Sequence, residues 1–189
     1  MKKWMNAMVL GLSLAVGVAK ANAPVVIQDF SSVDPKTSKD IGTYQDDKGS
    51  KIALEKAGKG DKTTLALKYT LVQGGWCGLW CRAGGVDWAG VDLTASKTVE
   101  FSVNSKGPVV LGMSLTDKNK NQYVAEVSVK GGAWEKVSVP LDSFKLDPYY
   151  TPPEAIKGAA KDFSKVSTFG LTPKTVGTAI VNVKDIVAQ

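Results

Sequence analysis

The sequence predicts an all-β domain, an antiparallel β-sandwich of the jelly-roll type. Three observations predict it. Apolar and polar residues alternate with a period of two along most of the chain, which is typical of strands with one buried face. Glycine-rich turns separate about ten such short runs, as in other β-sandwiches. Only residues 154–163, EAIKGAAKDF, have helical character, and that segment is short.

The expected strands follow one another with short connections. Residues 63–72 and 98–103 show the alternation most clearly, with apolar side chains at every second position. The glycine-rich segment 74–85, GGWCGLWCRAGG, is also expected to contain a strand. The remaining strands are expected at residues 25–30, 108–117, 122–129, 134–141, 166–173 and 178–187.

The N-terminal residues have the pattern of a bacterial export signal. Lys2 and Lys3 form a basic start, and an apolar run at residues 8–18 follows. Small residues at spacings of two then offer cleavage after Ala21 or after Ala23. We therefore expect residues 1–21 to be a cleaved signal peptide and the protein to be secreted or periplasmic.

The rest of the chain, residues 24–189, is expected to form a single domain. Loss of residues 1–21 removes three lysines and lowers the formal net charge from +6 to +3. This charge is small and mixed with acidic residues, so we expect no nucleic-acid partner. The apolar run at the N-terminus is shorter than the roughly 20 residues that a membrane-spanning helix needs, and no second run follows.

Both cysteines of the chain, Cys77 and Cys81, lie in the segment 74–85. The chain has no histidine, which excludes c-type haem attachment, Cys/His zinc sites and histidine-based catalytic pairs. In a regular strand their Cα atoms would be roughly 13 Å apart, whereas a disulfide needs about 4.4–6.8 Å. Two alternatives remain: Gly78 allows a tight loop closed by a disulfide, or both thiols are buried in the core.

The same alternation assigns the other residues of this segment to the opposite face. If Cys77 and Cys81 face the core, then Trp76, Trp80 and Arg82 face outward. Two indoles and a guanidinium on one strand face can stack on a ligand and hydrogen-bond its oxygens. The alternative is that one or both tryptophans fill the interior of the sandwich.

A second group of exposed aromatic candidates lies in the segment after residue 146. Tyr149 and Tyr150 are neighbours within a stretch that also contains three prolines. Prolines restrict the backbone, so less entropy is lost when such a loop binds a ligand. The two tyrosines therefore form either part of a binding site for sugar rings or a packed lid at the edge of the core.

Several segments, taken in order, resemble the family 11 carbohydrate-binding modules and the wider galactose-binding-like jelly rolls. The resemblance covers residues 25–187. The segments that carry it are VVIQDF at the start, IGTYQDDKGS, DWAGVDLTASKTVEFSV, WEKVSVPLDSF with the following Tyr-x-Pro-Pro loop, and VKDI near the end.

The resemblance implies a non-catalytic module that binds β-glucan chains in a cleft on a concave sheet and carries structural calcium. Tyr44 and Trp76 fall where the family places cleft aromatic residues, and Tyr150 falls on the tyrosine of the Tyr-x-Pro-Pro loop. The sequence also departs from the family pattern. Tyr149 stands where an acidic residue is expected, and Leu171 or Thr172 where another aromatic residue is usual.

Asp29 and Asp185 are the candidate calcium ligands. They lie in the first and last expected strands, which can be neighbours in a jelly roll. Calcium binds carboxylate and carbonyl oxygens, and the family resemblance points to the same metal. The DKNKN stretch at residues 117–121 is not expected to bind calcium, because it lacks the later glycine and glutamate of a calcium loop.

The sequence therefore predicts an exported carbohydrate-binding module rather than an enzyme, with a polysaccharide of the β-glucan type as partner. One alternative is an envelope assembly protein that uses the jelly roll for protein–protein contact. A small glycan-active enzyme is the other alternative, since a glycosidase needs two carboxylates across a cleft. The carboxylates that could supply them are Asp87, Asp92, Asp147 and Glu154.

Overall fold

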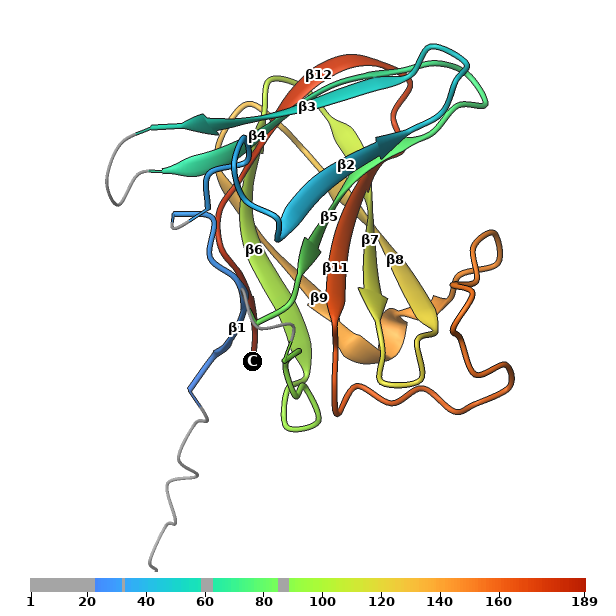
Figure 1. Cartoon of the computed structure of the whole chain (residues 1–189). Coiled ribbons are helices and arrows are strands. Elements are labelled where there is room, and N and C mark those ends of the chain that lie inside the picture. The colour runs from blue at the N-terminus through green and yellow to red at the C-terminus, as the bar shows by residue number, and fades with distance from the viewer. Residues whose placement is uncertain (1–22, 32, 59–62, 85–88) are drawn as a thin grey trace, which may run out of the picture.

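The computed structural model describes residues 23–31, 33–58, 63–84 and 89–189 of the chain. These residues form two antiparallel β-sheets that pack face to face (Figure 1). The described part contains no α-helix, only a single-turn 3₁₀-helix, η2 (Leu141–Ser143). The predicted all-β sandwich is confirmed. The expected signal peptide lies outside the described residues, and no helix within them is long and apolar enough to cross a membrane.

The first sheet, sheet A, has the strand order β1-β13-β6-β12-β4-β3, and β9 pairs with β6 along the opposite edge of that strand. β12 and β13 follow each other along one edge of β6, and Lys184 and Asp185 between them have no register partner in β6. Its strands are β1 (Val25–Gln28), β3 (Lys51–Ala57), β4 (Thr64–Leu71), β6 (Thr98–Ser105), β9 (Glu135–Pro140), β12 (Gly177–Val183) and β13 (Ile186–Ala188).

The second sheet, sheet B, has the strand order β10-β8-β7-β11-β5-β2. All of its strand pairs are antiparallel. Its strands are β2 (Ile41–Gln45), β5 (Cys77–Arg82), β7 (Val109–Thr116), β8 (Gln122–Val129), β10 (Lys145–Leu146) and β11 (Thr168–Pro173). β10 and β2 are therefore the two edges of this sheet.

The core lies between the two sheets and is built from the alternating side chains of both. Every second residue of β6 is buried, and β7 and β8 show the same period. Phenylalanines fill much of the interior: Phe30, Phe101, Phe144 and Phe169 are almost fully buried. This burial is the source of stability for a fold whose strands have one face in solvent.

The expected helix at residues 154–163 is wrong, because the structure has turns there. Gly158 adopts a φ of 78°, which a helix does not allow. The segment also bonds to the β7–β8 turn: Ile156 N donates to Asn119 O at 2.9 Å, and the Asn121 side chain donates to Ile156 O at 3.1 Å. These contacts hold the loop against sheet B.

Candidate functional site

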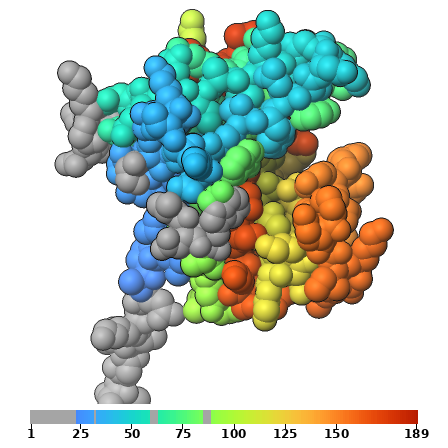
Figure 2. Space-filling view, in the orientation of Figure 1, coloured from blue at the N-terminus to red at the C-terminus, as the bar shows by residue number. Residues whose placement is uncertain are grey.

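The outer face of sheet B combines aromatic, glycine and polar residues. In β5, Cys77, Leu79 and Cys81 are fully buried, so Gly78 and Trp80 lie on the outer face. This is the division of faces that the alternation indicated. Figure 2 views this side of the molecule, with the segment after β10 standing out at one edge and the β2 region at the other.

The two cysteines are free thiols in the structure, and both are buried. The strand stays regular between them, so both side chains point into the core. Of the two alternatives, the structure shows buried thiols and not a disulfide. Burial raises the pKa of the Cys81 thiol, which therefore stays protonated at neutral pH. The cysteines serve as small apolar residues of the core.

Trp80 lies over a glycine of the neighbouring edge strand. Its register partner in β2 is Gly42, and its partner in β11 is Gly170. A Cβ atom on Gly42 would lie only 2.7–2.8 Å from the atoms of the indole. The indole can lie over Gly42 because this position has no side chain.

Tyr44 crosses the sheet in the opposite direction, over Gly78. Gly78 is its register partner, and a Cβ atom there would overlap the phenol oxygen of Tyr44. That hydroxyl is 2.6 Å from Thr172 Oγ1. Burial raises the pKa of Tyr44, and the hydrogen bond with Thr172 opposes this rise, so the hydroxyl keeps its proton at neutral pH. Thr172 thus holds the ring in place from β11.

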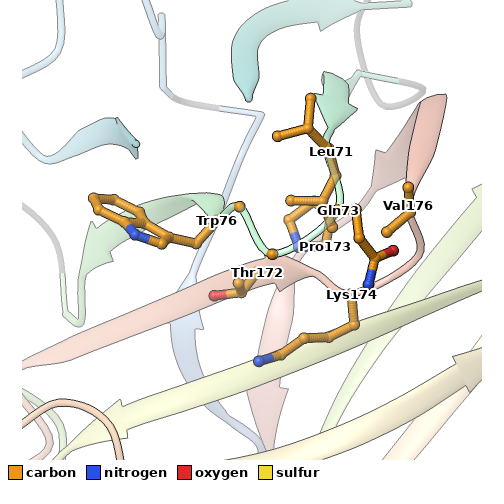
Figure 3. A pocket seen from close by; sticks show the side chains of 10 residues that line it. Leu71, Gln73, Trp76, Thr172, Pro173, Lys174 and Val176 are labelled. Atoms are coloured by element: carbon orange, nitrogen blue, oxygen red, sulfur yellow. The ribbon is translucent and has the colours of Figure 1, made fainter. Parts of the chain in front are cut away.

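Trp76 extends the aromatic group beyond the end of β5. Its ring centroid lies 6.0 Å from that of Tyr44, with the planes tilted by 41°, and half of its surface is exposed. It also lines a cavity of about 210 Å³ at this end of the sheet, together with Thr172 and Lys174 (Figure 3). Trp76, Tyr44 and Trp80 form one cluster, which we call the aromatic group of sheet B.

A buried carboxylate fixes the backbone that carries Trp76. Asp46 Oδ2 accepts a hydrogen bond from Trp76 N, and Asp46 Oδ1 accepts bonds from Lys48 N at 2.7 Å and Ser50 N at 3.2 Å. Gly75 leaves the room for this contact, since a Cβ atom there would overlap both Ser50 and Asp46. The position of Trp76 therefore depends on a polar anchor thirty residues earlier in the chain.

Polar side chains continue across the middle of the same face. Thr172 is paired with Gly112 of β7, and Gly112 with Glu126 of β8. The side chain of Lys174 lies over Gly112, where a Cβ atom would come within 3.0 Å of Lys174 Cε. Figure 3 shows this side chain running beside Thr172. The face thus offers hydroxyl, ammonium and carboxylate groups next to the aromatic group.

Tyr149 and Tyr150 lie at the other edge of sheet B, after β10. Tyr149 is 93% exposed and Tyr150 53% exposed, so neither is a packed lid over the core. Asp147 Oδ1 accepts bonds from both backbone N–H groups, and Asp147 Oδ2 accepts one from Gln122 Nε2 at 2.8 Å. Five strand spacings separate this edge from β2, or roughly 24 Å.

Arg82 does not point to open solvent. Its guanidinium lies 3.3 Å from Asp40 Oδ1, and both side chains are largely buried. Arg82 N also donates to Asp40 O at 2.8 Å. Arg82 therefore ties the start of β2 to the end of β5, at the margin of the face that carries Trp80.

The two candidate calcium ligands come together where β1 meets β13. Asp185 Oδ1 accepts a bond from Phe30 N at 3.3 Å, and Asp29 Oδ1 accepts bonds from the N–H and hydroxyl groups of Ser31 at 2.8 and 2.6 Å. Burial raises the pKa of Asp185, and the charge and hydrogen bond of Asp29 raise it further. The two carboxylates thus repel each other when both are ionised.

An unpaired oxygen lies next to this carboxylate pair in the chain. Gln28 is buried, and its Oε1 atom has no hydrogen-bond partner among the described residues. Carboxylate and amide oxygens are suitable calcium ligands, so these residues fit the metal. No group of three or more His, Cys, Asp or Glu gathers within the described ranges, so amide or backbone oxygens would complete the coordination.

The four carboxylates considered for catalysis have separate surroundings. Asp87 lies outside the described residues. Asp92 accepts bonds from the N–H and hydroxyl groups of Thr94 at 2.9 and 2.7 Å, which shapes a turn. Asp147 holds the tyrosine loop, as described above, and Glu154 is exposed on that loop. Asp92 and Asp147 therefore have structural roles in turns.

Comparison with solved structures shows which proteins share this fold. The chain is similar to the family 11 carbohydrate-binding module from Clostridium thermocellum in complex with a β-1,3-1,4-mixed-linked tetrasaccharide, with a TM-score of 0.70 and 16% identity over 89% of this chain and 96% of that chain. A family 30 carbohydrate-binding module of the same organism gives a TM-score of 0.52 and 17% identity over 89% and 93%.

Part of a larger enzyme has a similar fold. The chain matches 25% of an exo-β-agarase with a TM-score of 0.58 and 13% identity over 88% of its own length. No protein-family model and no curated protein matches the chain. The resemblance to family 11 modules seen in the sequence is confirmed as a shared jelly-roll fold, and the structural neighbours with the highest coverage of both chains are carbohydrate-binding modules.

Proposed function

We propose that this protein is a non-catalytic carbohydrate-binding module that holds a polysaccharide of the β-glucan type across the outer face of sheet B. The observation that carries the proposal is the aromatic group itself. The indole of Trp80 lies over Gly42 and the hydroxyl end of the Tyr44 ring lies over Gly78, so both rings lie across the outer surface of the sheet. Side chains larger than glycine at these positions would prevent this arrangement.

The chemistry of the face suits a sugar chain. A pyranose ring has an apolar face that packs on an aromatic ring, and hydroxyl groups at its rim that need donors and acceptors. Thr172, Lys174 and Glu126 supply such groups beside the aromatic group. Tyr149 and Tyr150 stand at the opposite edge, so a chain lying across the strands would meet aromatic residues at both ends.

Both aromatic ends are held before any ligand arrives. Asp46 fixes the backbone of Trp76, and Asp147 fixes the backbone of the two tyrosines. A site whose loops are already ordered loses less conformational entropy on binding. The mixed-linked tetrasaccharide in a family 11 module of the same fold supports a β-glucan as the first ligand class to test.

The proposal includes export and a structural calcium ion. Residues 1–21 would direct the chain out of the cytoplasm and be removed after Ala21 or Ala23, which sequencing of the mature N-terminus tests. Calcium would be held by Asp29, Asp185 and Gln28, where it would neutralise the carboxylate pair and join the first strand to the last.

A protein partner in the cell envelope is the second candidate, and one observation favours it. Leu146 of β10 is 56% exposed, and the loop after β10 exposes Tyr149 by 93% and Ile156 by 59%. Grouped apolar side chains on a surface often mark a protein contact. The two candidates differ in what retains the protein: soluble polysaccharide in one, a cellular protein in the other.

Native affinity electrophoresis tests the proposed function. The mature protein would run through gels that contain mixed-linkage β-glucan, xyloglucan, agarose or no polysaccharide. We expect retardation in at least one polysaccharide, and its loss in Trp76→Ala and in Tyr150→Ala. Unchanged mobility of the wild type in every gel would contradict the proposal and would favour the protein partner.

A further inference from the structure

The outer face of sheet A carries an ordered row of side chains that the proposed function does not use. Asn104 of β6 is paired with Asn182 of β12, and Asn182 with Ala66 of β4. Trp134 comes directly before β9, next to the pair of Glu135 and Val103. The row therefore runs from an indole over two amides to a small residue, on the side of the sandwich opposite to the aromatic group of sheet B.

Trp134 is positioned rather than freely mobile on this surface. It is 48% exposed although it lies on a face whose other residues are mostly polar. The ammonium group of Lys184 lies over its ring, 5.5 Å from the centroid. Lys184 N also donates to Ser102 O at 2.9 Å, so this lysine reaches the ring from the far edge of β6. A cation over one ring face fixes the indole and adds a donor beside it.

The two asparagines leave their hydrogen-bonding groups available. Both side chains are half-buried, and within the described part of the chain neither amide has a hydrogen-bond partner. Directly opposed residues have Cβ atoms about 4.5–5.5 Å apart. Two planar amides at that spacing offer four donor hydrogens and two acceptor oxygens to one neighbour. Half-buried amides gain more from such a partner than fully solvated ones, because the local dielectric is lower.

We propose that Trp134, Asn104 and Asn182, with Lys184, form a second saccharide-binding site on the outer face of sheet A. An indole that packs on the apolar face of a sugar ring, next to planar donors and acceptors for its hydroxyls, is the combination that a neutral saccharide chain needs. Ala66 continues the row beside Asn182 with a small apolar side chain. The ligand class is a neutral oligo- or polysaccharide.

The position of this site has a consequence for assembly. The two sites lie on opposite outer faces of the sandwich, so one ordered segment of a chain cannot occupy both. A module with two such faces would bind two polysaccharide chains or two distant segments of one chain. Binding to a solid or gelled polysaccharide would then be tighter than binding to a short oligosaccharide, because the second contact is intramolecular.

An NMR titration can measure the two sites separately. Indole N–H and side-chain amide signals of ¹⁵N-labelled mature protein would be followed during addition of a β-1,3-1,4-linked glucan tetrasaccharide and, separately, neoagarotetraose. We expect the Trp134 indole and the Asn104 and Asn182 amide signals to move, and to move also in the Trp76→Ala, Tyr150→Ala double variant. The proposal of a second site would be overturned if none of these three signals moved with either oligosaccharide.

The same titration keeps this inference apart from the proposed function. If the Trp76 indole signal moves and the Trp134 signal does not, the sheet B site is supported and the sheet A site is contradicted. If only the Trp134 signal moves, the sheet A site is supported and the sheet B site is contradicted. Trp134→Ala should weaken binding at the sheet A face about tenfold, since a stacked aromatic contact is lost. Ser138→Ala, an exposed change on the same face of β9 outside the row, is the matched control and should leave binding unchanged.

Discussion

The side-chain carboxylate of Asp46 accepts a hydrogen bond from the backbone N–H of Trp76, thirty residues later in the chain. The same carboxylate holds the turn that follows β2 through Lys48 N and Ser50 N. One buried acid therefore connects the edge strand that carries Tyr44 to the loop that carries Trp76. The geometry of the aromatic group depends on this connection, since the two rings lie 6.0 Å apart.

Asp46→Asn should weaken polysaccharide binding and lower the melting temperature by several degrees. The amide has one acceptor oxygen and a donor group, so it cannot accept all the bonds that the carboxylate accepts. Trp76 N would lose its partner and the indole would shift. Asp47→Asn, an exposed change next to it, is the control and should alter neither property. Normal retardation of Asp46→Asn in polysaccharide gels would contradict the anchoring role.

The contribution of Asp46 to stability should depend on pH. Burial by itself raises the pKa of Asp46, but the bonds from Trp76, Ser50 and Lys48 outweigh it and hold the pKa below its ordinary value. A lowered folded-state pKa gives stability that is present above the unfolded-state pKa of about 3.9 and is lost as pH falls through the folded value. The difference in melting temperature between wild type and Asp46→Asn should therefore shrink from pH 6 to pH 3. A constant difference in melting temperature from pH 6 to pH 3 would contradict the pH-dependent contribution of Asp46.

Gly78→Ala should displace Tyr44 and weaken binding, because the new methyl group would overlap the Tyr44 hydroxyl. Overpacking of this kind costs about 1–3 kcal/mol of stability, and the hydrogen bond of Tyr44 with Thr172 would also be lost. Gly107→Ala is the matched control, since a Cβ atom there meets nothing within 4 Å. Affinity electrophoresis and urea unfolding measure the two effects. Equal behaviour of both variants would show that the position of the Tyr44 ring does not depend on a glycine at residue 78.

The face of each residue in β5 could be predicted from the sequence, because the period of two is a local property. The roles of the glycines could not be. Gly42 and Gly78 appear in the sequence as ordinary small residues, and their function arises only from the register between β2 and β5. The role of Asp46 was also missed, since its partner Trp76 is distant in sequence and the bond is to backbone.

The local helical preference of residues 154–163 did not decide their conformation, for a related reason. Its alanines and lysines favour a helix locally, but the loop at Asp117–Asn121 offers tertiary bonds that outweigh this preference. β3 was missed because its sequence, KIALEKA, has few β-branched residues and lies at the edge of sheet A. Its pairing with β4 decides its conformation.

Lys161→Met should loosen the loop that carries the two tyrosines. The Lys161 ammonium donates to Leu141 O and Phe144 O, both at 3.1 Å, and lies 5.8 Å from the centroid of the Tyr123 ring. Methionine keeps the length of the side chain but loses these bonds, which should cost about 1–2 kcal/mol. Urea unfolding measures the loss, and faster proteolysis within residues 147–162 should accompany it. Lys157→Met is the exposed control on the same loop, and equal stability of the two variants would contradict the prediction.

The Asp185→Asn variant should show separately how the carboxylate pair lowers the melting temperature and how calcium raises it. The pKa of Asp185 is raised by burial and by Asp29. A raised folded-state pKa gives stability that is present below the unfolded-state pKa and is lost as pH rises through the folded value. At pH 7 without metal, the ionised pair is therefore unfavourable. We expect Asp185→Asn in EDTA to melt at the same temperature as wild type or higher.

In the presence of calcium, wild type should melt at a higher temperature than Asp185→Asn. Wild type should gain several degrees in millimolar Ca²⁺, because an ion that binds only the folded state stabilises it by mass action. Asp185→Asn should gain little, since one of the two carboxylates that would hold the ion is gone. Asp142→Asn, an exposed change in η2, should respond to calcium as wild type does. Calorimetry with and without EDTA measures all three. An equal calcium response in Asp185→Asn and wild type would place the ion elsewhere, and no response in wild type would remove calcium from the proposal.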